Sequence, residues 1–279
     1  MNIERISIHG GHSGSFCNHA EDTLEEILVA YINAGFKMAG ITEHMPAVEE
    51  KFMYPDEKEA GMTVKTLHKR FCNYFQECAG LKNKFRDQIS ILIGFETEMY
   101  SGTTDYIHKI IKTYCPDYFV GSLHHVDDMM IDVSDQLYSK AVEESGGLVN
   151  LYCRYFDQQF EMIKELEPDV IGHFDLVRFF DSDYPVTLKN PEVNEKIERN
   201  LQMIKNLDLI LDLNLSGFDK PAKEQYPSID ILKRAVELGI AIAPGDDSHG
   251  VSTVGRHFEK GMNILKSIGC RINYRRLLA

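Results

Sequence analysis

The sequence predicts an α/β protein built on a parallel barrel of seven strands. Seven short apolar runs are spaced along the chain, and most are separated by longer amphipathic patterns. Continuous apolar runs, as opposed to strict alternation, are typical of parallel strands that are buried on both faces. The predicted strands are Arg5–Ile8, Met38–Thr42, Ser90–Phe95, Tyr118–Ser122, Asp169–Gly172, Leu209–Leu213 and Ala241–Pro244.

The segments between these runs predict helices. The first begins with Asp22 as a cap and Glu25 three residues later, followed by apolar residues at helical spacing. Asn190 is a predicted cap with Pro191 at the first helical position. The other predicted helices are Thr63 to Phe85, Ala141 to Glu165, Asn190 to Asn206, Ser228 to Leu238 and Val254 to Ile268. This alternation favours a parallel barrel, although periodicity alone does not separate a closed barrel from an open, doubly wound sheet.

The composition is that of a globular chain of one large domain or two small ones, with 279 residues, 43% of them hydrophobic. A net charge of −13 argues against nucleic-acid or anionic-membrane partners, but not against a small phosphorylated substrate. Six cysteines are scattered without CxxC spacing, and no run approaches the length of a membrane helix. We therefore expect a cytoplasmic protein. The sequence does not predict its oligomeric state.

Polar side chains follow every predicted strand. The loops beyond the carboxyl ends of barrel strands converge on one mouth, and imidazole and carboxylate groups there suit Zn, Fe or Mn. A single buried histidine is more often a packed residue, but a polar set at every strand end predicts a metal cluster. The set is His9, His12 and His19, then Glu43 and His44, Glu96 and Glu98, His124 and His125, His173 and Asp175, Asn214 and Ser216, and Asp246, Asp247 and His249. His68, His108 and His257 are interpreted as ordinary surface or packing residues.

Nine segments carry a resemblance to a known family. They are HSGSFCNHA (12–20), ITEHMP (41–46), KFMYPDE (51–57), GFETE (94–98), GSLHHV (121–126), GHFDLVRFF (172–180), DLNLSGF (212–218), YPS (226–228) and GDDSHG (245–250). In order and spacing, the chain resembles the PHP (polymerase and histidinol phosphatase) superfamily, particularly its histidinol-phosphate phosphatases. The resemblance implies a distorted seven-stranded (β/α)7 TIM-like barrel, formed by residues 1–279 as a single metallophosphoesterase domain.

The resemblance also implies a site with two to three divalent transition-metal ions, Zn, Fe or Mn. Glu96 would be shared between two ions, and Asp246 would be structural. Glu98 and His125 lie beside ligands and either orient them or simply pack. The implied metal ligands are His12, His19, His44, Glu96, His124, His173, Asp247 and His249.

The first motif departs from the usual His-x-His. An alignment that places His12 on the second histidine places Gly10 on the first, so His9 is one residue early. Gly10 and Gly11 tolerate the backbone angles of a bulge, and we expect such a bulge to bring His9 into the site as a further ligand. The alternative is that His9 faces the wrong side of its strand.

A second departure concerns the phosphate. Phosphatases of this group carry an Arg after the sixth strand, where this chain has Asp219. Arg178 and Lys220 are the candidate phosphate ligands, with Arg256 a weaker third, and Asn214 and Ser216 lie in the candidate substrate loop. Replacing an arginine that binds phosphate through two N–H groups is not a conservative change. The identity of the substrate is therefore left open, whereas hydrolysis of a phosphoester is still expected.

The implied activity is hydrolysis of a phosphate monoester such as L-histidinol phosphate, in histidine biosynthesis. A metal-bound hydroxide on the Glu96-bridged pair would attack phosphorus, and Asp247, His249 or His125 could direct a proton to the leaving group. The alternatives are another small phosphate ester or nucleotide at the same site, or a catalytically silent metal-binding protein. Cys17 is interpreted as a packed thiol.

Overall fold

The computed structural model describes residues 4–278; residues 1–3 and 279, the ends of the predicted domain, lie outside the described part. Each of the seven predicted apolar runs overlaps a strand, which confirms those predictions, although β8 and β9 each extend one residue further. A short hairpin, β5 and β6, was not predicted. The strands are β1 (Ile6–Ser7), β2 (Met38–Ile41), β3 (Ser90–Ile93), β4 (Val120–Gly121), β5 (His125–Val126), β6 (Met129–Met130), β7 (Val170–Ile171), β8 (Ile210–Asn214) and β9 (Ala241–Gly245).

The seven main strands form two parallel sheets, in the orders β1-β2-β3 and β4-β7-β8-β9. The predicted α/β class is therefore confirmed, but the strands do not form one closed seven-stranded ladder. Each break in the ladder lies beside a strand of two residues, β1 in one case and β4 in the other. Contacts outside the ladders span the gaps; among them, Glu96 bridges to Val120, and the Ile8 N–H donates to the Pro244 carbonyl at 3.0 Å.

The two sheets share an apolar interior. Side chains from strands of both sheets pack into one buried cluster, separate from the larger core beneath the helices. This shared cluster orients the carboxyl ends of the strands toward a common region. Its strand members include Ile6, Met38, Val120, Val170, Ile210 and Ala243.

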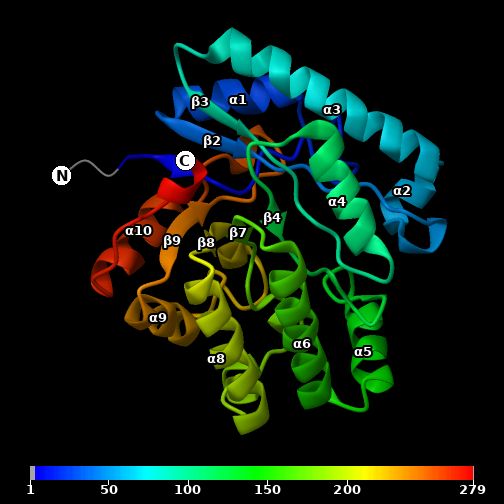
Figure 1. Cartoon of the computed structure of the whole chain (residues 1–279), viewed down its shortest axis with the longest axis vertical. Coiled ribbons are helices and arrows are strands. Elements are labelled where there is room, and N and C mark those ends of the chain that lie inside the picture. The colour runs from blue at the N-terminus through cyan, green and yellow to red at the C-terminus, as the bar shows by residue number, and fades with distance from the viewer. Residues whose placement is uncertain (1–3, 279) are drawn as a thin grey trace.

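Helices surround the strands, with α1 and α3 on one side and α5, α6 and α8 on the opposite side (Figure 1). Within residues 4–278, every helix is too short or too polar to cross a membrane. The helices are α1 (Leu24–Asn33), α2 (Pro55–Glu59), α3 (Val64–Phe85), α4 (Thr103–Tyr114), α5 (Asp135–Glu144), α6 (Leu148–Leu166), α7 (Tyr184–Thr187), α8 (Pro191–Asn206), α9 (Ile229–Leu238) and α10 (Phe258–Ser267).

The predicted cap of α1 is wrong by one residue. Thr23, not Asp22, caps the helix: its hydroxyl accepts from the Glu26 N–H, and the Glu26 carboxylate accepts from the Thr23 N–H at 2.8 Å. The predicted starts at Thr63 and Asn190 are confirmed as the caps of α3 and α8.

The single helix predicted over 141–165 is also wrong. Two helices, α5 and α6, meet at Gly146 and Gly147, whose φ angles are +77° and +126°. Both angles lie in the region that glycine alone adopts freely, so the pair ends one helix and starts the next. The helix predicted from Val254 begins only at Phe258, after a 3-10 turn (Val251–Thr253).

Truncating the core between α6 and the end of β7 should destabilise the fold. Phe156 is fully buried and packs on Phe174, which lies between two site residues. We expect Phe156→Ala to lower the free energy of unfolding by about 3–5 kcal/mol, since a cavity remains. Urea unfolding measures this, and Val186→Ala, at a side chain that is 71% exposed, should change it by less than about 0.5 kcal/mol. Equal midpoints for the two variants would contradict the prediction.

Candidate metal centre

The centre of the site is the carboxylate of Glu96, which is 1% exposed. Glu96 follows β3 and makes single bridges to His44 and Val120, so it stands where the two sheets meet. Three imidazole nitrogens surround its Oε1 atom. They are Nε2 of His173 at 2.9 Å, Nε2 of His124 at 3.2 Å and Nε2 of His9 at 3.3 Å.

The second oxygen of Glu96 faces a different pair of histidines. Its Oε2 atom lies 3.2 Å from Nδ1 of His44 and 3.8 Å from Nε2 of His12. The carboxylate of Asp247 extends this side, because its Oδ1 lies 3.6 Å from the same His12 nitrogen and 3.6 Å from Nδ1 of His249. One carboxylate therefore separates two sets of nitrogen donors.

All nine residues predicted as ligands come together here. Their ligand atoms fall into overlapping groups of three or four, within 4.8 Å of one another in each group. Glu98 joins His44 and His124 in one group, and Cys17 joins His19, His44 and His249 in another. The groups can hold several metal ions. The nine are His9, His12, His19, His44, Glu96, His124, His173, Asp247 and His249.

Unpartnered buried atoms indicate that these residues fit metal ions. Nε2 of His9, Nδ1 of His44 and both ring nitrogens of His12 have no hydrogen-bond partner among the described residues. Buried polar atoms normally have partners, and each atom left without one costs free energy. Ligation by a cation would satisfy these nitrogens and match the surrounding carboxylates.

The protonation preferences of Glu96, His12 and His249 suit ligation. For His9 and His44, burial opposes the charge but the Glu96 carboxylate raises the pKa of both, so each must give up a proton when it binds a metal ion. Burial opposes ionisation of Glu96, but the charges of His9 and His44 hold its pKa well below its ordinary value. Burial lowers the pKa of both His12 and His249 well below the usual value, so their rings stay neutral. An ionised carboxylate and a neutral imidazole are the forms that bind metal.

His9 reaches the cluster through a distorted backbone. Gly10 and Gly11 have φ angles of +146° and +74°, as a glycine bulge requires. Space for His9 comes from Gly245, where an added Cβ would lie 2.7 Å from the Cβ of His9. The ring is fully buried, and its Nδ1 lies 2.8 Å from Oδ2 of Asp212.

Two acidic residues orient histidines and a third lies near one without a hydrogen bond to it; none was singled out for that role in the sequence. Asp212 contacts Nδ1 of His9, and Asp132 contacts Nδ1 of His124 at 2.8 Å. Glu43, whose pKa burial raises to about 7, lies 3.7 Å from Nδ1 of His12. A charged residue inside an apolar strand is a usable signal for Asp212, but Asp132 follows the unpredicted hairpin and has none.

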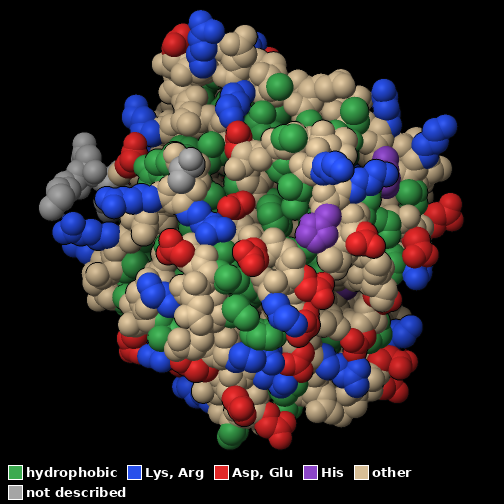
Figure 2. Space-filling model, viewed as in Figure 1, with side chains coloured by type: hydrophobic (Ala, Val, Ile, Leu, Met, Phe, Trp, Pro, Cys, Tyr) green, Lys and Arg blue, Asp and Glu red, His purple; other side chains and the backbone are tan. Residues whose placement is uncertain are grey.

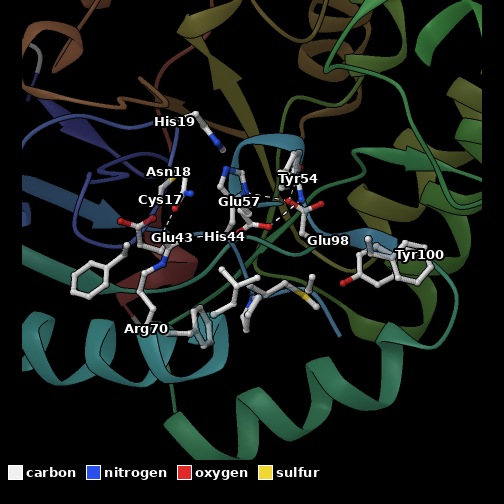
Figure 3. Close-up of a pocket in the computed structure, with 17 residues that line it drawn as sticks. Cys17, Asn18, His19, Glu43, His44, Tyr54, Glu57, Arg70, Glu98 and Tyr100 are labelled. Carbon is white, nitrogen blue, oxygen red and sulfur yellow. Dashed lines mark hydrogen bonds and ion pairs between the residues drawn. The ribbon is translucent and has the colours of Figure 1, made fainter. Parts of the chain in front are cut away.

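A cavity of about 390 Å³ opens on the cluster. Its walls include Tyr54, Asp56, Phe179, Ser216 and Lys220 beside the predicted ligands. A smaller recess adjoins it, where Figure 3 shows His44, Tyr54 and Glu98 pointing toward one another. The Tyr54 hydroxyl donates to Glu98 at 2.9 Å. On the outer face in Figure 2, acidic and basic side chains are interspersed.

Two predicted substrate residues lie elsewhere. Arg178 is fully buried, donates to Asp175 and to the Gln225 carbonyl, and is not among the residues that line the cavity. Asn214 also lies outside the lining; its amide nitrogen donates to Asp212 and Asp247. Both residues support the walls from behind.

Of the histidines interpreted as ordinary, His108 is exposed and His68 is half-buried against Tyr106. His257 is more specifically placed, because it lies 2.8 Å from Asp219. Asp246 accepts hydrogen bonds from Tyr31, Ser7 and the Gly255 N–H, which holds the loop before the last ligands. Burial raises the pKa of the Cys17 thiol well above its ordinary value, as in a packed thiol.

Comparison with known proteins gives relatives over most of the chain. A probable histidinol-phosphatase of Schizosaccharomyces pombe is 38% identical over 268 residues, which cover 95% of this chain and 87% of that protein. The histidinol-phosphatase of Saccharomyces cerevisiae is 28% identical, over 90% of this chain and 85% of its own length.

Solved structures agree with this relationship. A Listeria monocytogenes protein assigned as the histidinol phosphatase HisK superposes with a TM-score of 0.80 at 28% identity, over 92% of this chain and 99% of that one. The histidinol phosphate phosphatase of Lactococcus lactis, solved with zinc, L-histidinol and phosphate, shares the fold with a TM-score of 0.73 at 21% identity, over 97% of this chain and 96% of that one. The PHP domain model matches residues 10–216. The chain therefore belongs to the PHP domain family.

Proposed function

We propose that this protein is a metal-dependent phosphomonoesterase that hydrolyses L-histidinol phosphate to L-histidinol and phosphate, in histidine biosynthesis. The observation that carries the proposal is the division of five histidine nitrogens between the two oxygens of Glu96. A bridging carboxylate of this kind suits adjacent ions that clamp a phosphoryl group. Relatives named histidinol-phosphatase in two yeasts support the substrate.

We assign the nine clustered residues as ligands of two to three ions of Zn, Fe or Mn. Such ions supply an activated water and neutralise the charge that develops on phosphate. Glu96 holds two donor sets at a fixed separation, while Asp212 and Asp132 fix the ring orientations of His9 and His124.

The substrate side of the proposal rests on the cavity. Ser216 and Lys220 line it and face the phosphoryl group in our assignment, whereas Arg178 acts from behind the wall. Asp247 and His249 line the same cavity, and in our assignment they direct the proton that the attacking water gives up toward the leaving alkoxide. We keep a cytoplasmic location as a prediction.

We also propose that the seven parallel strands act as one distorted barrel, within a single domain over residues 1–279. Support comes from the shared apolar interior and from hydrogen bonds across both gaps. In one gap the Asp247 N–H donates to the His9 carbonyl at 2.8 Å, and in the other the Val120 N–H donates to the Phe95 carbonyl at 2.9 Å.

The first test is substrate preference. The metal-loaded protein should hydrolyse histidinol phosphate with a kcat/KM at least about tenfold above a panel of small phosphomonoesters, because an added pocket contact is worth that much. It should cleave p-nitrophenyl phosphate but not the bis ester at a comparable rate. Release of inorganic phosphate measures both. No turnover of any ester by fully loaded protein would refute the proposed activity.

The second test concerns His9. We expect His9→Ala to lose about one ion per chain and at least about 100-fold in rate, since it removes a ligand. Metal analysis and phosphate release measure these, with His108→Ala as the exposed control. A full metal count with an unchanged rate would show that His9 is not a ligand.

The third test concerns Asp212. Asp212→Asn keeps the shape of the side chain but weakens the acceptor for His9, so metal affinity should fall about 10- to 100-fold. Competition with a chelator measures the affinity. Asp230→Asn, at an exposed ion pair on α9, is the matched control. Equal affinities in both variants would remove Asp212 from the proposed ligand support.

A further inference from the structure

An ion pair spans two loops beside the metal centre. Asp219 ends the 3-10 turn after β8 (Leu215–Asp219), and Arg256 lies just before α10. Nη1 of Arg256 lies 3.2 Å from Oδ2 of Asp219, and Nη2 donates to the Asp247 carbonyl at 2.9 Å. His257 contacts the other Asp219 oxygen at 2.8 Å. The guanidinium is thus fixed at two points.

The guanidinium borders the space where a substrate would bind. Arg256 lines a cavity of about 380 Å³ together with Ser216, Lys220, Asp247 and His249. The same four residues line the main cavity over the metal centre, so the two spaces adjoin. Arg178 lines neither of these two cavities.

The guanidinium of Arg256 has N–H donors that these two contacts do not use. A guanidinium has five N–H groups, and two take part in the contacts to Asp219 and the Asp247 carbonyl. Its side chain is 14% exposed, so part of it reaches the cavity. An arginine already held in place loses little conformational entropy when it binds a phosphate, and its planar fork suits phosphate oxygens.

We propose that Asp219 is a positioning residue that holds Arg256 at the cavity, where Arg256 and Lys220 bind the phosphoryl group. The cation that the sequence lacks at position 219 is then supplied from the loop before α10. The identity of the ester rests on the proposed function, but the phosphate contact does not.

The competing explanation is that Arg256 only clamps the Asp247 carbonyl. Asp247 has a positive φ of +48°, so its backbone would benefit from such a clamp. That role would affect metal content and stability, whereas a phosphate role affects anion binding by protein that is fully loaded. The two roles are therefore separable.

The experiment measures inorganic phosphate binding to metal-loaded protein by calorimetry, alongside KM and kcat. Arg256→Gln should weaken phosphate binding about tenfold or more and raise KM more than it lowers kcat, with metal content unchanged. Arg234→Gln is the control, because Arg234 pairs with Glu198 and Glu237 on the outer surface. Asp219→Asn should weaken phosphate binding about threefold to tenfold, and Asp219→Glu should restore most of it.

Unchanged phosphate affinity in fully loaded Arg256→Gln protein would overturn the proposal, as would reduced metal content as its only defect. Failure of the unmodified loaded protein to bind phosphate would overturn it too. If the unmodified protein binds phosphate through Arg256 but does not hydrolyse histidinol phosphate, the proposal stands and the substrate assignment fails. If the unmodified protein hydrolyses histidinol phosphate but Arg256→Gln does not change phosphate binding, the substrate assignment stands and the proposal on Arg256 fails.

Discussion

The structure depends on a negative charge buried where two sheets meet. An isolated carboxylate at that depth would be neutral, because removing it from water costs more than its fold could supply. Around Glu96, five imidazoles compensate this cost, and they come from the ends of four strands, since His9 and His12 both follow β1. The buried charge of Glu96 is therefore stable only where several strands end at the same place and bring their histidines to it.

This arrangement couples folding to the composition of the site. The ladder is interrupted between β3 and β4 and between β1 and β9, where hydrogen bonds outside the ladders and the shared apolar cluster join the sheets. Ligands on both sides of those gaps would be joined by the same ions. Metal binding would then contribute to the stability of the fold as well as to chemistry, as in other proteins whose sites form only on folding.

The features that could be predicted from the sequence are those that local patterns determine. Buried parallel strands leave apolar runs, and the polar residues directly after them marked most of the cluster. Features that depend on tertiary contacts were missed: Arg178 was predicted to bind phosphate, yet Asp175 and two carbonyls hold it in the interior. Glu98 was left between two roles because its distance to His44, 3.1 Å, depends on how two loops meet. The break at Gly146 was missed because the apolar spacing continues across it.

The glycines around His9 have a consequence for reading natural variants of this chain. His9 is close-packed against Gly245, which has no side chain, and the next residue, Gly10, adopts a φ of +146° that other residues rarely reach. A methyl group at Gly245 would press on His9 and Asp212, and one at Gly10 would press on Asp246 and on the backbone of the ligand Asp247, while every donor atom stays in the sequence. A relative with the complete set of histidines and carboxylates, but with alanine at one of these glycines, would therefore be a poor candidate for the full complement of ions.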